Sequence, residues 1–571
     1  MAAKNAAIIA LFTLVVAGVV AATIIIIQKK NRYDNGINPS QKAIVDLCQN
    51  TYYQESCITS LSKATISSDP KDLIRTSFKT AMEELGNVIK RSATLQEASK
   101  NPETAKAYQT CQKLLNDSIF DFQKTLERTD SIDISNLSLL MDDIKTWLTG
   151  ALTYQETCLD CFEDAEADAA TKMREFLKLG RELTINGLAL ANGFSNFLES
   201  NDLGAGRRLR AHKMDLINKE GYIGEHWLDH APRSRRLFHA APGDIKPHVT
   251  VAKDGSGNFM TIGEALKSVP LRCNETYVIY IKAGVYEENV IIDTAMWSVM
   301  FVGDGPNATK ITGNKSKVGG TETFWTATVG VDGDNFIAKD IGFENSAGAT
   351  MHQAVALRTS GDKSIFYNCQ IDGYQDTVFA HNHRQFFRDC TISGTIDFIF
   401  GNARAVFQNC TLLVRKPLEN QRACLVTAEG RTTVNETSGI MLQNCRIMPA
   451  PEYPVNDPTY KTYLGRPWKP YSRTIIMDSY LDSLVDPEGW APWNVTSAHL
   501  DTCWYAEVNN KGPGANLARR VAWPGIKKIT VNEAGAFTPG QYMVGDSWIA
   551  GKGIPYDSGL MQSAPITMPT P

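Results

Sequence analysis

The amino-acid sequence predicts a multi-domain protein, with an all-α bundle of the four-helix type followed by an all-β, right-handed parallel β-helix. Three observations support this expectation. The chain has 571 residues, which is too many for one hydrophobic core. Its first third shows helical spacing of apolar residues, whereas its second half shows short runs of Val, Ile, Phe and Thr broken by Gly, Asn and Asp. A phrase in the second half recurs about every 20 residues, which is typical of stacked coils.

The N-terminal segment is apolar and is followed by basic residues. Residues 6–27 carry no formal charge over 22 positions, and 28–32 contain three cations. Such a run is long for a signal-peptide core and long enough to span a bilayer. We therefore favour a signal-anchor over a cleaved signal peptide for residues 1–37; a buried core helix suits a run at this position less well. Either form directs the chain into the secretory pathway.

Net charge, cysteine spacing and glycosylation sequons limit the classes of binding partner and the cellular compartment to be expected. The net charge of −4 gives no reason to expect nucleic acid as a partner. The twelve cysteines then lie in an oxidising compartment, and Cys158-x-x-Cys161 has no second pair at zinc-site spacing. Sequons for N-glycosylation occur at seven positions: Asn116, Asn136, Asn274, Asn307, Asn314, Asn435 and Asn494.

Residues 38–200 have the pattern of an antiparallel helical bundle. Turn signals at 68–70 and 101–102 divide the region into helices. Apolar residues recur at steps of three and four in one stretch, namely Leu137, Leu140, Met141, Ile144 and Leu148. Four cysteines are candidates for disulfides: Cys48 and Cys57 could staple a helical hairpin, and Cys111 and Cys158 could tie two later helices.

Residues 201–247 form a linker with two basic clusters, at 204–210 and 233–238. A solvated spacer is the simplest interpretation of such clusters. In a secreted chain they are also protease sites, and this is the interpretation we favour. The cluster at 233–238 is the better candidate because the strand pattern begins soon after it.

The strand-rich part, residues 248–571, carries the repeated phrase at 365–371, 386–392, 406–412 and 441–447. Its cysteines are 21, 20 and 35 residues apart. Short strands without intervening helices, repeating at this period, predict a parallel β-helix. The cysteines then form an internal stack; whether some pair or all stay free is left open by the spacing.

Two aspartates stand in unusual surroundings and suggest the chemistry. Asp376 lies in Gly-Tyr-Gln-Asp-Thr-Val (373–378), and Asp397 lies 21 residues later in Gly-Thr-Ile-Asp-Phe-Ile-Phe-Gly (394–401). A carboxylate among apolar residues is costly to bury unless it has a partner or a function. Because the spacing equals one coil, both carboxylates are expected to point into one cleft.

Other polar residues are aligned by the same stacking. Gln353 and Gln375 are 22 residues apart, so they are expected on adjacent turns of the same face. A cation comes later, in Tyr-Leu-Gly-Arg-Pro-Trp (463–468), and spacing alone does not place Arg466 near the aspartates.

Five segments in this order resemble the plant pectin methylesterases, and the resemblance runs from about Val249 to Tyr542. They are GVYEE (284–288), QAVALR (353–358), GYQDTV (373–378), GTIDFIFG (394–401) and LGRPW (464–468). The helical region resembles the pectin methylesterase inhibitor domain through the cysteine framework of Cys48, Cys57, Cys111 and Cys158. Cys161 departs from that framework, where a glycine is usual. The linker residues Arg235, Arg236, Leu237 and Phe238 resemble the processing site between the two halves.

The resemblance implies a role for each candidate residue. Asp397 is the nucleophile that attacks the methyl ester of a galacturonate unit, and Asp376 is the general acid and then the general base. Gln353 and Gln375 donate hydrogen bonds to the oxyanion. Arg466 lies beside Asp397 and keeps it anionic, while the like charge raises the pKa of Asp376.

The resemblance also implies the substrate contacts. Trp468 stacks on a sugar ring, and Thr323, Gln353 and Arg466 touch the substrate. No metal or organic cofactor is needed.

Each assignment has a structural alternative. Asp376 could be a turn residue, and Asp397 could serve only as a buried partner of Arg466. The two glutamines could form an amide ladder, and Trp468 could be core. Trp490 and Trp493 could line the cleft or pack in the core. Phe379 stands where tyrosine is usual, which puts subsite preference in doubt. Cys503 is a further departure from the family pattern and could pair with Cys273.

The implied partners follow from the family. They are methyl-esterified homogalacturonan, proteinaceous pectinesterase inhibitors and a processing protease of the subtilase type; the mature form is expected as a monomer in the extracellular cell wall, and a precursor could be membrane-anchored.

Three competing functions remain to be separated. A calcium-dependent pectin lyase shares the solenoid but needs a carboxylate cluster for the metal, where this chain has amides. An inhibitor with an inactive β-helix, or a carbohydrate-binding module, predicts incomplete catalytic residues, yet the whole set is present.

Overall fold

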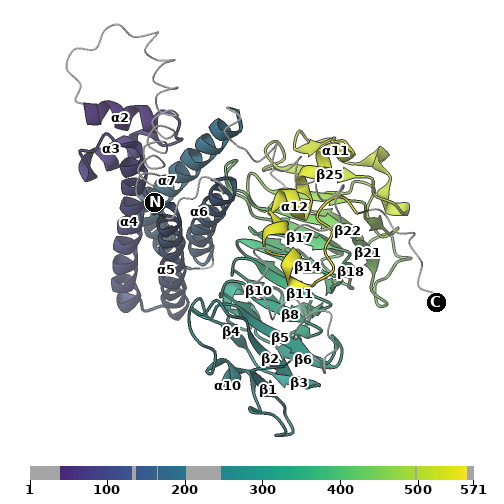
Figure 1. The fold of residues 1–571 in the computed structure, drawn as a ribbon. Helices are drawn as coiled ribbons and strands as arrows, with labels where there is room; N and C mark the ends of the chain where they lie inside the picture. Colours follow the sequence, from purple (N-terminus) through teal and green to yellow (C-terminus); the bar gives the residue numbers. More distant parts are fainter. Residues whose placement is uncertain (1–38, 131–136, 164, 201–245, 495–497, 562–571) are drawn as a thin grey trace, which may run out of the picture. The chain divides into compact units, whose positions relative to one another are not determined.

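The computed structural model describes residues 39–130, 137–163, 165–200, 246–494 and 498–561. These residues form two compact units, one of helices and one of strands (Figure 1). The expected signal segment, the processing candidates at 235–238 and the sequon at Asn136 lie outside the described residues. Within the described ranges, no helix combines the length and apolar character needed to cross a membrane.

The helical unit is a bundle of four long helices with a short helical pair before it. The helices are α2 (Pro39–Cys48), α3 (Gln54–Ala64), α4 (Pro70–Ala98), α5 (Pro102–Asp130), α6 (Leu137–Asp160) and α7 (Ala167–Ser200). Among the long helices, α4 packs on α5, α5 on α6, α6 on α7 and α7 on α4. The predicted four-helix-type bundle is therefore confirmed.

The turn signals read from the sequence are helix N-caps. The Asp69 side chain accepts a hydrogen bond from the N–H of Lys71 at 2.8 Å, and Pro70 is the first residue of α4. Asn101 does the same for α5, where its Oδ1 accepts from the N–H of Glu103 at 2.9 Å. Both helices thus begin where a side-chain oxygen satisfies a free backbone donor.

Disulfides join Cys48 to Cys57, between α2 and α3, and Cys111 to Cys158, between α5 and α6. Neither disulfide includes Cys161. Between the long helices, the buried Gln155 amide of α6 donates to the Ser118 hydroxyl of α5 at 3.2 Å and to the Thr184 hydroxyl of α7 at 2.9 Å. The bundle is held by covalent links as well as by a polar contact inside its core.

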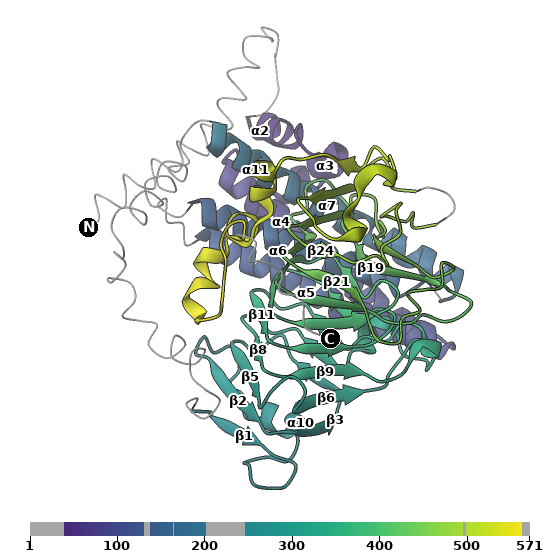
Figure 2. The ribbon, with the colours of Figure 1, turned by 90° about the vertical axis from the view of Figure 1, so that its right-hand side faces the viewer.

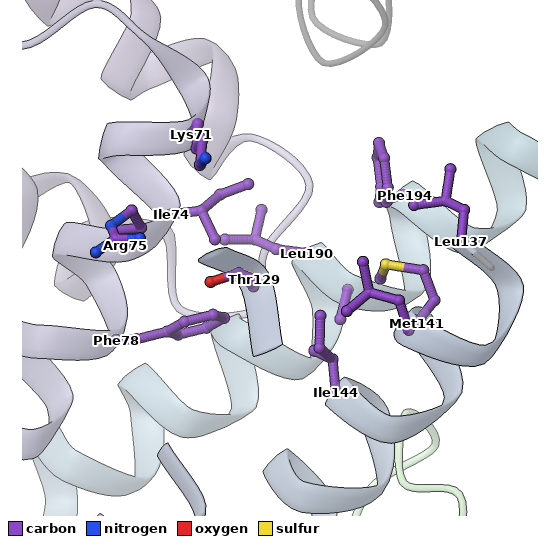
Figure 3. A pocket seen from close by; sticks show the side chains of 12 residues that line it. Lys71, Ile74, Arg75, Phe78, Thr129, Leu137, Met141, Ile144, Leu190 and Phe194 are labelled. Atoms are coloured by element: carbon purple, nitrogen blue, oxygen red, sulfur yellow. The ribbon is translucent and has the colours of Figure 1, made fainter. Parts of the chain in front are cut away.

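Figure 3 shows an apolar pocket inside this bundle. Its wall includes Phe78 of α4, Met141 and Ile144 of α6, and Leu190 of α7. The described side chains that line it include no carboxylate, histidine or thiol. This pocket therefore lacks, among the described residues that line it, the paired carboxylates that the sequence predicts for the catalytic site.

The strand unit is a solenoid of three parallel sheets (Figure 2). The 11-stranded sheet contains, in spatial order, β1 (Val249–Val251), β2 (Tyr277–Ile281), β5 (Val299–Gly303), β8 (Ile337–Lys339), β11 (Ser364–Tyr367), β14 (Arg384–Arg388), β17 (Arg404–Gln408), β20 (Gly439–Gln443), β23 (Arg473–Met477), β25 (Trp504–Val508) and β26 (Ile526–Lys527).

The two other sheets complete each coil. The 8-stranded sheet contains β24 (Tyr480–Leu481), β21 (Arg446–Pro449), β18 (Thr411–Val414), β15 (Thr391–Gly394), β12 (Gln370–Asp372), β9 (Gly342–Asn345), β6 (Thr309–Gly313) and β3 (Gly284–Glu287). The 7-stranded sheet contains β22 (Lys461–Gly465), β19 (Ala423–Glu429), β16 (Ile399–Gly401), β13 (Val378–Ala380), β10 (Leu357–Thr359), β7 (Val329–Val331) and β4 (Val290–Ile292). Within each sheet, neighbouring strands pair in parallel, as the predicted β-helix requires.

Short helices lie outside the sheets. They are α10 (Ile262–Leu266), α11 (Val531–Ala534) and α12 (Pro539–Tyr542). Tyr542, Met543 and Trp548 of the C-terminal segment pack with Phe386 and Val406 of the 11-stranded sheet. The C-terminal segment thus covers the outer face of that sheet.

The repeated phrase is the strand-to-strand register of the solenoid. Ile365 pairs with Phe386, Phe386 with Val406, and Val406 with Met441. The last step is longer in sequence because the coil between β17 and β20 carries the extended segments around β19. Equivalent residues of the phrase therefore stack one above another, as expected from the spacing.

The interior columns of the phrase are apolar. Phe366 stacks on Phe387 with ring centroids 4.7 Å apart, and Phe387 stacks on Phe407 at 4.3 Å. The four stacked cysteines are free, buried thiols: Cys369, Cys390, Cys410 and Cys445. Cys273 and Cys503 are also free, so the pairing considered for them does not occur.

A column of Asn and Asp residues turns the chain at one corner of successive coils. Asn368, Asp389, Asn409 and Asn444 have φ between 51° and 57°. This left-handed conformation is tolerated better by Asn and Asp than by other non-glycine residues. Asn409 donates to the Asp389 carboxylate at 2.6 Å, and Asn444 donates to Asn409 at 3.1 Å. Each coil's corner is therefore tied to the coil beside it.

Candidate active site

Asp376 and Asp397 occupy equivalent positions on adjacent coils of the 7-stranded sheet. Each lies two residues before its strand, β13 or β16, and Val378 pairs with Ile399 across them. The N–H of Asp376 donates to the carbonyl of Ile396 at 3.0 Å. The two residues are 7% and 5% exposed, respectively. The spacing of one coil therefore brings the two carboxylates to one place.

Both aspartates adopt the left-handed backbone conformation, with φ of 65° at Asp376 and 49° at Asp397. The turn before Asp397 needs Gly394, because a Cβ there would lie 2.2 Å from the Cβ of Phe398 and 2.7 Å from the Thr377 hydroxyl. That hydroxyl in turn donates to the carbonyl of Ser393 at 2.9 Å. The glycine and threonine of the two motifs thus pack the turns closely, and strained residues of this kind are frequent at functional sites.

Arg466 reaches Asp397 through sheet pairing. It follows β22, which pairs with β19, and β19 pairs with β16 just after Asp397. The N–H of Arg466 donates to the carbonyl of Thr427 at 3.0 Å. Its Nε donates to Asp397 Oδ1 at 3.0 Å, and its Nη2 donates to Oδ2. The guanidinium therefore forms a bidentate ion pair with Asp397 through two parallel hydrogen bonds.

The two carboxyl groups differ in their electrostatic surroundings. Burial raises the pKa of Asp376 well above its usual range, the charge of Asp397 raises it further, and Arg466 lowers it. Burial also raises the pKa of Asp397, but the charge and hydrogen bonds of Arg466 lower it, so the rise is smaller. Asp397 is thus the first of the pair to ionise, and Asp376 is the one that keeps its proton.

The two glutamines come from neighbouring coils. The N–H of Ala354, next to Gln353, donates to the carbonyl of Gln375 at 3.2 Å. Both side chains are half-buried. The buried Oε1 of Gln375 has no hydrogen-bond partner within the described part of the chain. A buried amide left in this state is costly, and rotation of the amide lets it offer either an N–H or an oxygen to a ligand.

Aromatic residues surround the carboxylates. The Phe379 ring is buried and stacks on Phe400 at 4.2 Å. Half-buried Trp468 lies 6.0 Å from Phe400 and 6.4 Å from Trp493. A Cβ at Gly430 would lie 2.9 Å from the Trp468 ring, so the glycine makes room for the indole. Trp468 thus presents an aromatic surface close to Arg466.

Trp490 and Trp493 have different surroundings. Trp490 is 1% exposed and stacks on Tyr505 at 4.4 Å, so it is core. The Arg466 guanidinium carbon lies 4.2 Å from the ring centroid of Trp493, so Trp493 is part of the site. The sequence left both alternatives open for each residue.

Thr323 lies in the 3₁₀-helix η3 (Thr323–Trp325) and is half-buried. Its neighbour Phe324 packs on the guanidinium of Arg358 at 3.8 Å, and Arg358 is fully buried and pairs with Asp332. The structure therefore fixes η3 on the coil that leads to Gln353. No sequence pattern indicated the role of Arg358, although it is the last residue of the QAVALR motif.

The family model described as Pectinesterase matches residues 248–546, more than half of the chain. The chain belongs to the pectinesterase family. The family model for plant invertase/pectin methylesterase inhibitors matches residues 42–190.

Individual relatives agree with this assignment. The chain is 46% identical over 550 residues to pectinesterase/pectinesterase inhibitor 28 of Arabidopsis thaliana, covering 96% of this chain and 74% of the relative. It is 50% identical over 392 residues to a pectinesterase of Petunia integrifolia, covering 68% of this chain and 100% of the relative. The carrot pectin methylesterase structure matches with a TM-score of 0.54 and 45% identity, covering 55% of this chain and 99% of that chain.

The strand unit is thus a pectin methylesterase domain with the right-handed β-helix of that family, and the helical unit is a domain of the inhibitor type. Membership in the pectinesterase family sets aside the lyase, inhibitor-only and carbohydrate-binding alternatives.

Proposed function

We propose that this pectinesterase hydrolyses methyl esters of homogalacturonan with Asp397 as the nucleophile and Asp376 as the general acid and base. The observation that carries the proposal is the asymmetry of the pair, because Arg466 donates two hydrogen bonds to Asp397 while Asp376 is the carboxyl whose pKa is raised more. One carboxylate is then ready to attack while its neighbour holds a proton.

In the first half-reaction, an Asp397 oxygen forms a bond to the ester carbonyl carbon. The resulting tetrahedral intermediate collapses by breaking the bond to the methoxy oxygen, and Asp376 gives that oxygen its proton, so methanol leaves. The enzyme is left as an anhydride between Asp397 and the galacturonate carboxyl. In the second half-reaction, Asp376 takes a proton from water as the water oxygen attacks, and Asp397 departs as a carboxylate.

The oxyanion of each intermediate is stabilised by amide N–H groups of Gln353 and Gln375. We expect Gln375→Ala to lower kcat by about 10²-fold, because one oxyanion donor typically contributes 10²- to 10³-fold in rate. Gln353→Ala should act in the same direction. Initial rates of methanol release from esterified pectin measure both effects. Gln443→Ala, which removes a buried glutamine that donates to the Gly559 carbonyl, is the control and should keep kcat within about twofold. A drop confined to KM in both site variants would contradict the oxyanion role.

The substrate chain is held by Trp468, Thr323, Gln353 and Arg466. Trp468 offers its indole face to a sugar ring, and its half-buried position between Phe400 and Trp493 fixes the plane of that face. The Trp493 ring packs against the guanidinium of Arg466 and thereby orients both Arg466 and the sugar beside it.

Activity should follow a bell-shaped dependence on pH. It should fall as the pH drops through the pKa of Asp397, because the nucleophile becomes protonated. It should also fall as the pH rises through the pKa of Asp376, because the acid loses its proton. Burial raises both values, and that of Asp376 more, so the active window lies above the ordinary carboxyl range. Profiles of kcat/KM against pH measure the two limbs.

The identity of the basic limb can be tested directly. In Asp376→Asn the remaining activity should lose its basic limb, because no ionisable acid is left at that position. A basic limb that persists unchanged in this variant would assign the general acid elsewhere.

The inhibitor-type region is proposed to be removed by cleavage near Arg235, Arg236, Leu237 and Phe238, by a protease of the subtilase class in the secretory pathway. The mature enzyme then acts in the cell wall, where inhibitors of the same type as its own helical region are candidate partners. Comparing methanol release by the uncut chain with release by the chain cleaved after Phe238 tests whether the inhibitor-type region restrains the enzyme. Equal rates would show that the region does not restrain the enzyme.

A further inference from the structure

We propose that Arg415 is a positioning residue that clamps the two catalytic turns together. The proposal rests on the function assigned to Asp376 and Asp397. Arg415 directly follows β18 and belongs to none of the motifs that point to the active site. Its contacts nevertheless reach both turns.

The side chain of Arg415 holds the turn that leads to Asp376. Its Nη1 donates to the carbonyl of Gly373 at 3.1 Å, and its Nη2 donates to the hydroxyl of Tyr374 at 2.7 Å. The guanidinium carbon also lies 3.8 Å from the ring centroid of Tyr374. Three contacts thus fix the two residues that immediately precede Gln375 and Asp376.

The backbone of Arg415 holds the turn that leads to Asp397. Its N–H donates to the carbonyl of Gly394 at 2.8 Å, three residues before Asp397. The two turns also meet directly, since the N–H of Thr395 donates to the carbonyl of Tyr374 at 2.8 Å. Arg415 is therefore a single residue bonded to both sides of the junction.

Each nitrogen of the guanidinium has a protein partner. Besides the bonds to Gly373 and Tyr374, Nε donates to Glu452 at 2.9 Å, and the Arg415 side chain is only 25% exposed. A guanidinium committed in this way holds the turns in place instead of binding the ester. The planar arrangement of its donors makes all three bonds possible at once, which a lysine ammonium cannot reproduce.

The consequence for catalysis is geometric. Gln375 and Asp376 must lie at a fixed distance from the carbonyl that Asp397 attacks, and a displacement of about 1 Å can cost about 10²-fold in rate. Loosening the turn also admits water to Asp376. Because burial is the main cause of the raised pKa of Asp376, greater hydration should lower that pKa.

The test compares Arg415→Gln and Arg415→Lys with the unmodified full chain. We expect kcat on esterified pectin to fall about 10- to 100-fold in Arg415→Gln, with KM changed by less than about threefold. Arg415→Lys should recover only a small part of the loss, because the ammonium keeps the charge but not the planar donors. The basic limb of the pH profile should move to lower pH in both variants.

Two further variants keep the test decisive. Arg388→Gln is the matched control: Arg388 donates to Gln408 and pairs with Asp557 on the 11-stranded sheet, and its loss should leave the basic limb in place. Tyr374→Phe removes only the hydroxyl that accepts from Nη2, keeps the ring, and should shift the basic limb in the same direction if Arg415→Gln fails to fold. Thermal unfolding verifies the folded state of each variant.

The outcomes are distinct. An unshifted basic limb with unchanged kcat in folded Arg415→Gln, or in Tyr374→Phe where Arg415→Gln does not fold, overturns the clamp. A rise in KM alone also overturns it, since that result assigns Arg415 to substrate contact. Full activity of Asp397→Asn would instead overturn the proposed function, whatever the Arg415 variants do.

Discussion

Asp397→Asn is expected to lower methanol release from esterified pectin by about 10⁴-fold or more. The amide has no ionised oxygen to attack the ester, and the loss of a nucleophile removes the whole covalent route. The residual rate comes from binding and from the oxyanion donors. Single-turnover experiments should show no rapid release of methanol, because the anhydride no longer forms.

Loss of the ion pair with Arg466 must be separated from loss of the nucleophile. Asp362 supplies the control, because it is equally buried and its carboxylate accepts from Arg384 Nε at 2.9 Å and from Nη2 at 2.6 Å. Asp362→Asn removes a comparable buried pair, and breaking such a pair costs about 3–5 kcal/mol of stability. It should lower the melting temperature while the folded protein keeps its turnover. Equal losses of turnover in the two variants would point to a structural role for Asp397.

Arg466→Gln is expected to lower kcat/KM by about 10³-fold at neutral pH and to displace the acidic limb toward higher pH. Arg466 lowers the pKa of Asp397 against the effect of burial, so its removal lets that pKa rise. Each unit of rise makes the ionised nucleophile about tenfold scarcer below its pKa. The variant also loses the guanidinium that packs on Trp493.

A pH profile of kcat/KM for Arg466→Gln decides this prediction. The control is Arg520→Gln, because Arg520 pairs with Glu507 through two bonds of 2.8 Å and 3.0 Å and is buried more deeply than Arg466. That control should change stability and leave the acidic limb where it is. An acidic limb of Arg466→Gln that stays in place, or moves to lower pH, would show that Arg466 does not hold Asp397 in its ionised form.

Much of the fold could be predicted because, in a solenoid, the length of each coil appears as the period of the sequence repeat. The step from Ile365 to Phe386 and from Phe386 to Val406 is both the spacing of the phrase and the register of the strands. Helix boundaries were predictable from turn signals for the same reason, since the structure shows Asp69 and Asn101 bonding to residues only two positions away. Local rules of this kind need no knowledge of the tertiary structure.

The position of the two aspartates was predictable, but that of Arg466 was not. A single coil separates Asp376 from Asp397, whereas Arg466 reaches Asp397 only after two more strands, β19 and β22, have paired in the same sheet. The lengths of the connecting loops do not reveal that pairing. The family resemblance supplied the expectation that spacing could not.

The roles of residues that act through packing were the hardest to predict from the sequence. Trp490 and Trp493 lie three residues apart, yet one stacks on Tyr505 in the core and the other lies against Arg466. Arg358 and Arg415 look like ordinary charged residues in sequence, because what distinguishes them is the aromatic ring each one covers. The state of the stacked cysteines was equally undetermined, since a column of thiols has the same spacing whether or not its members pair.

The longer coil between β17 and β20 has a practical consequence for engineering. The coil that separates Asp376 from Asp397 admits no change in length without rotating one carboxyl away from the other, whereas the exposed stretch between β18 and β19 already interrupts the regular repeat. Insertions at the exposed residues Glu419 and Asn420 should therefore be accommodated without altering the spacing of the two carboxyls.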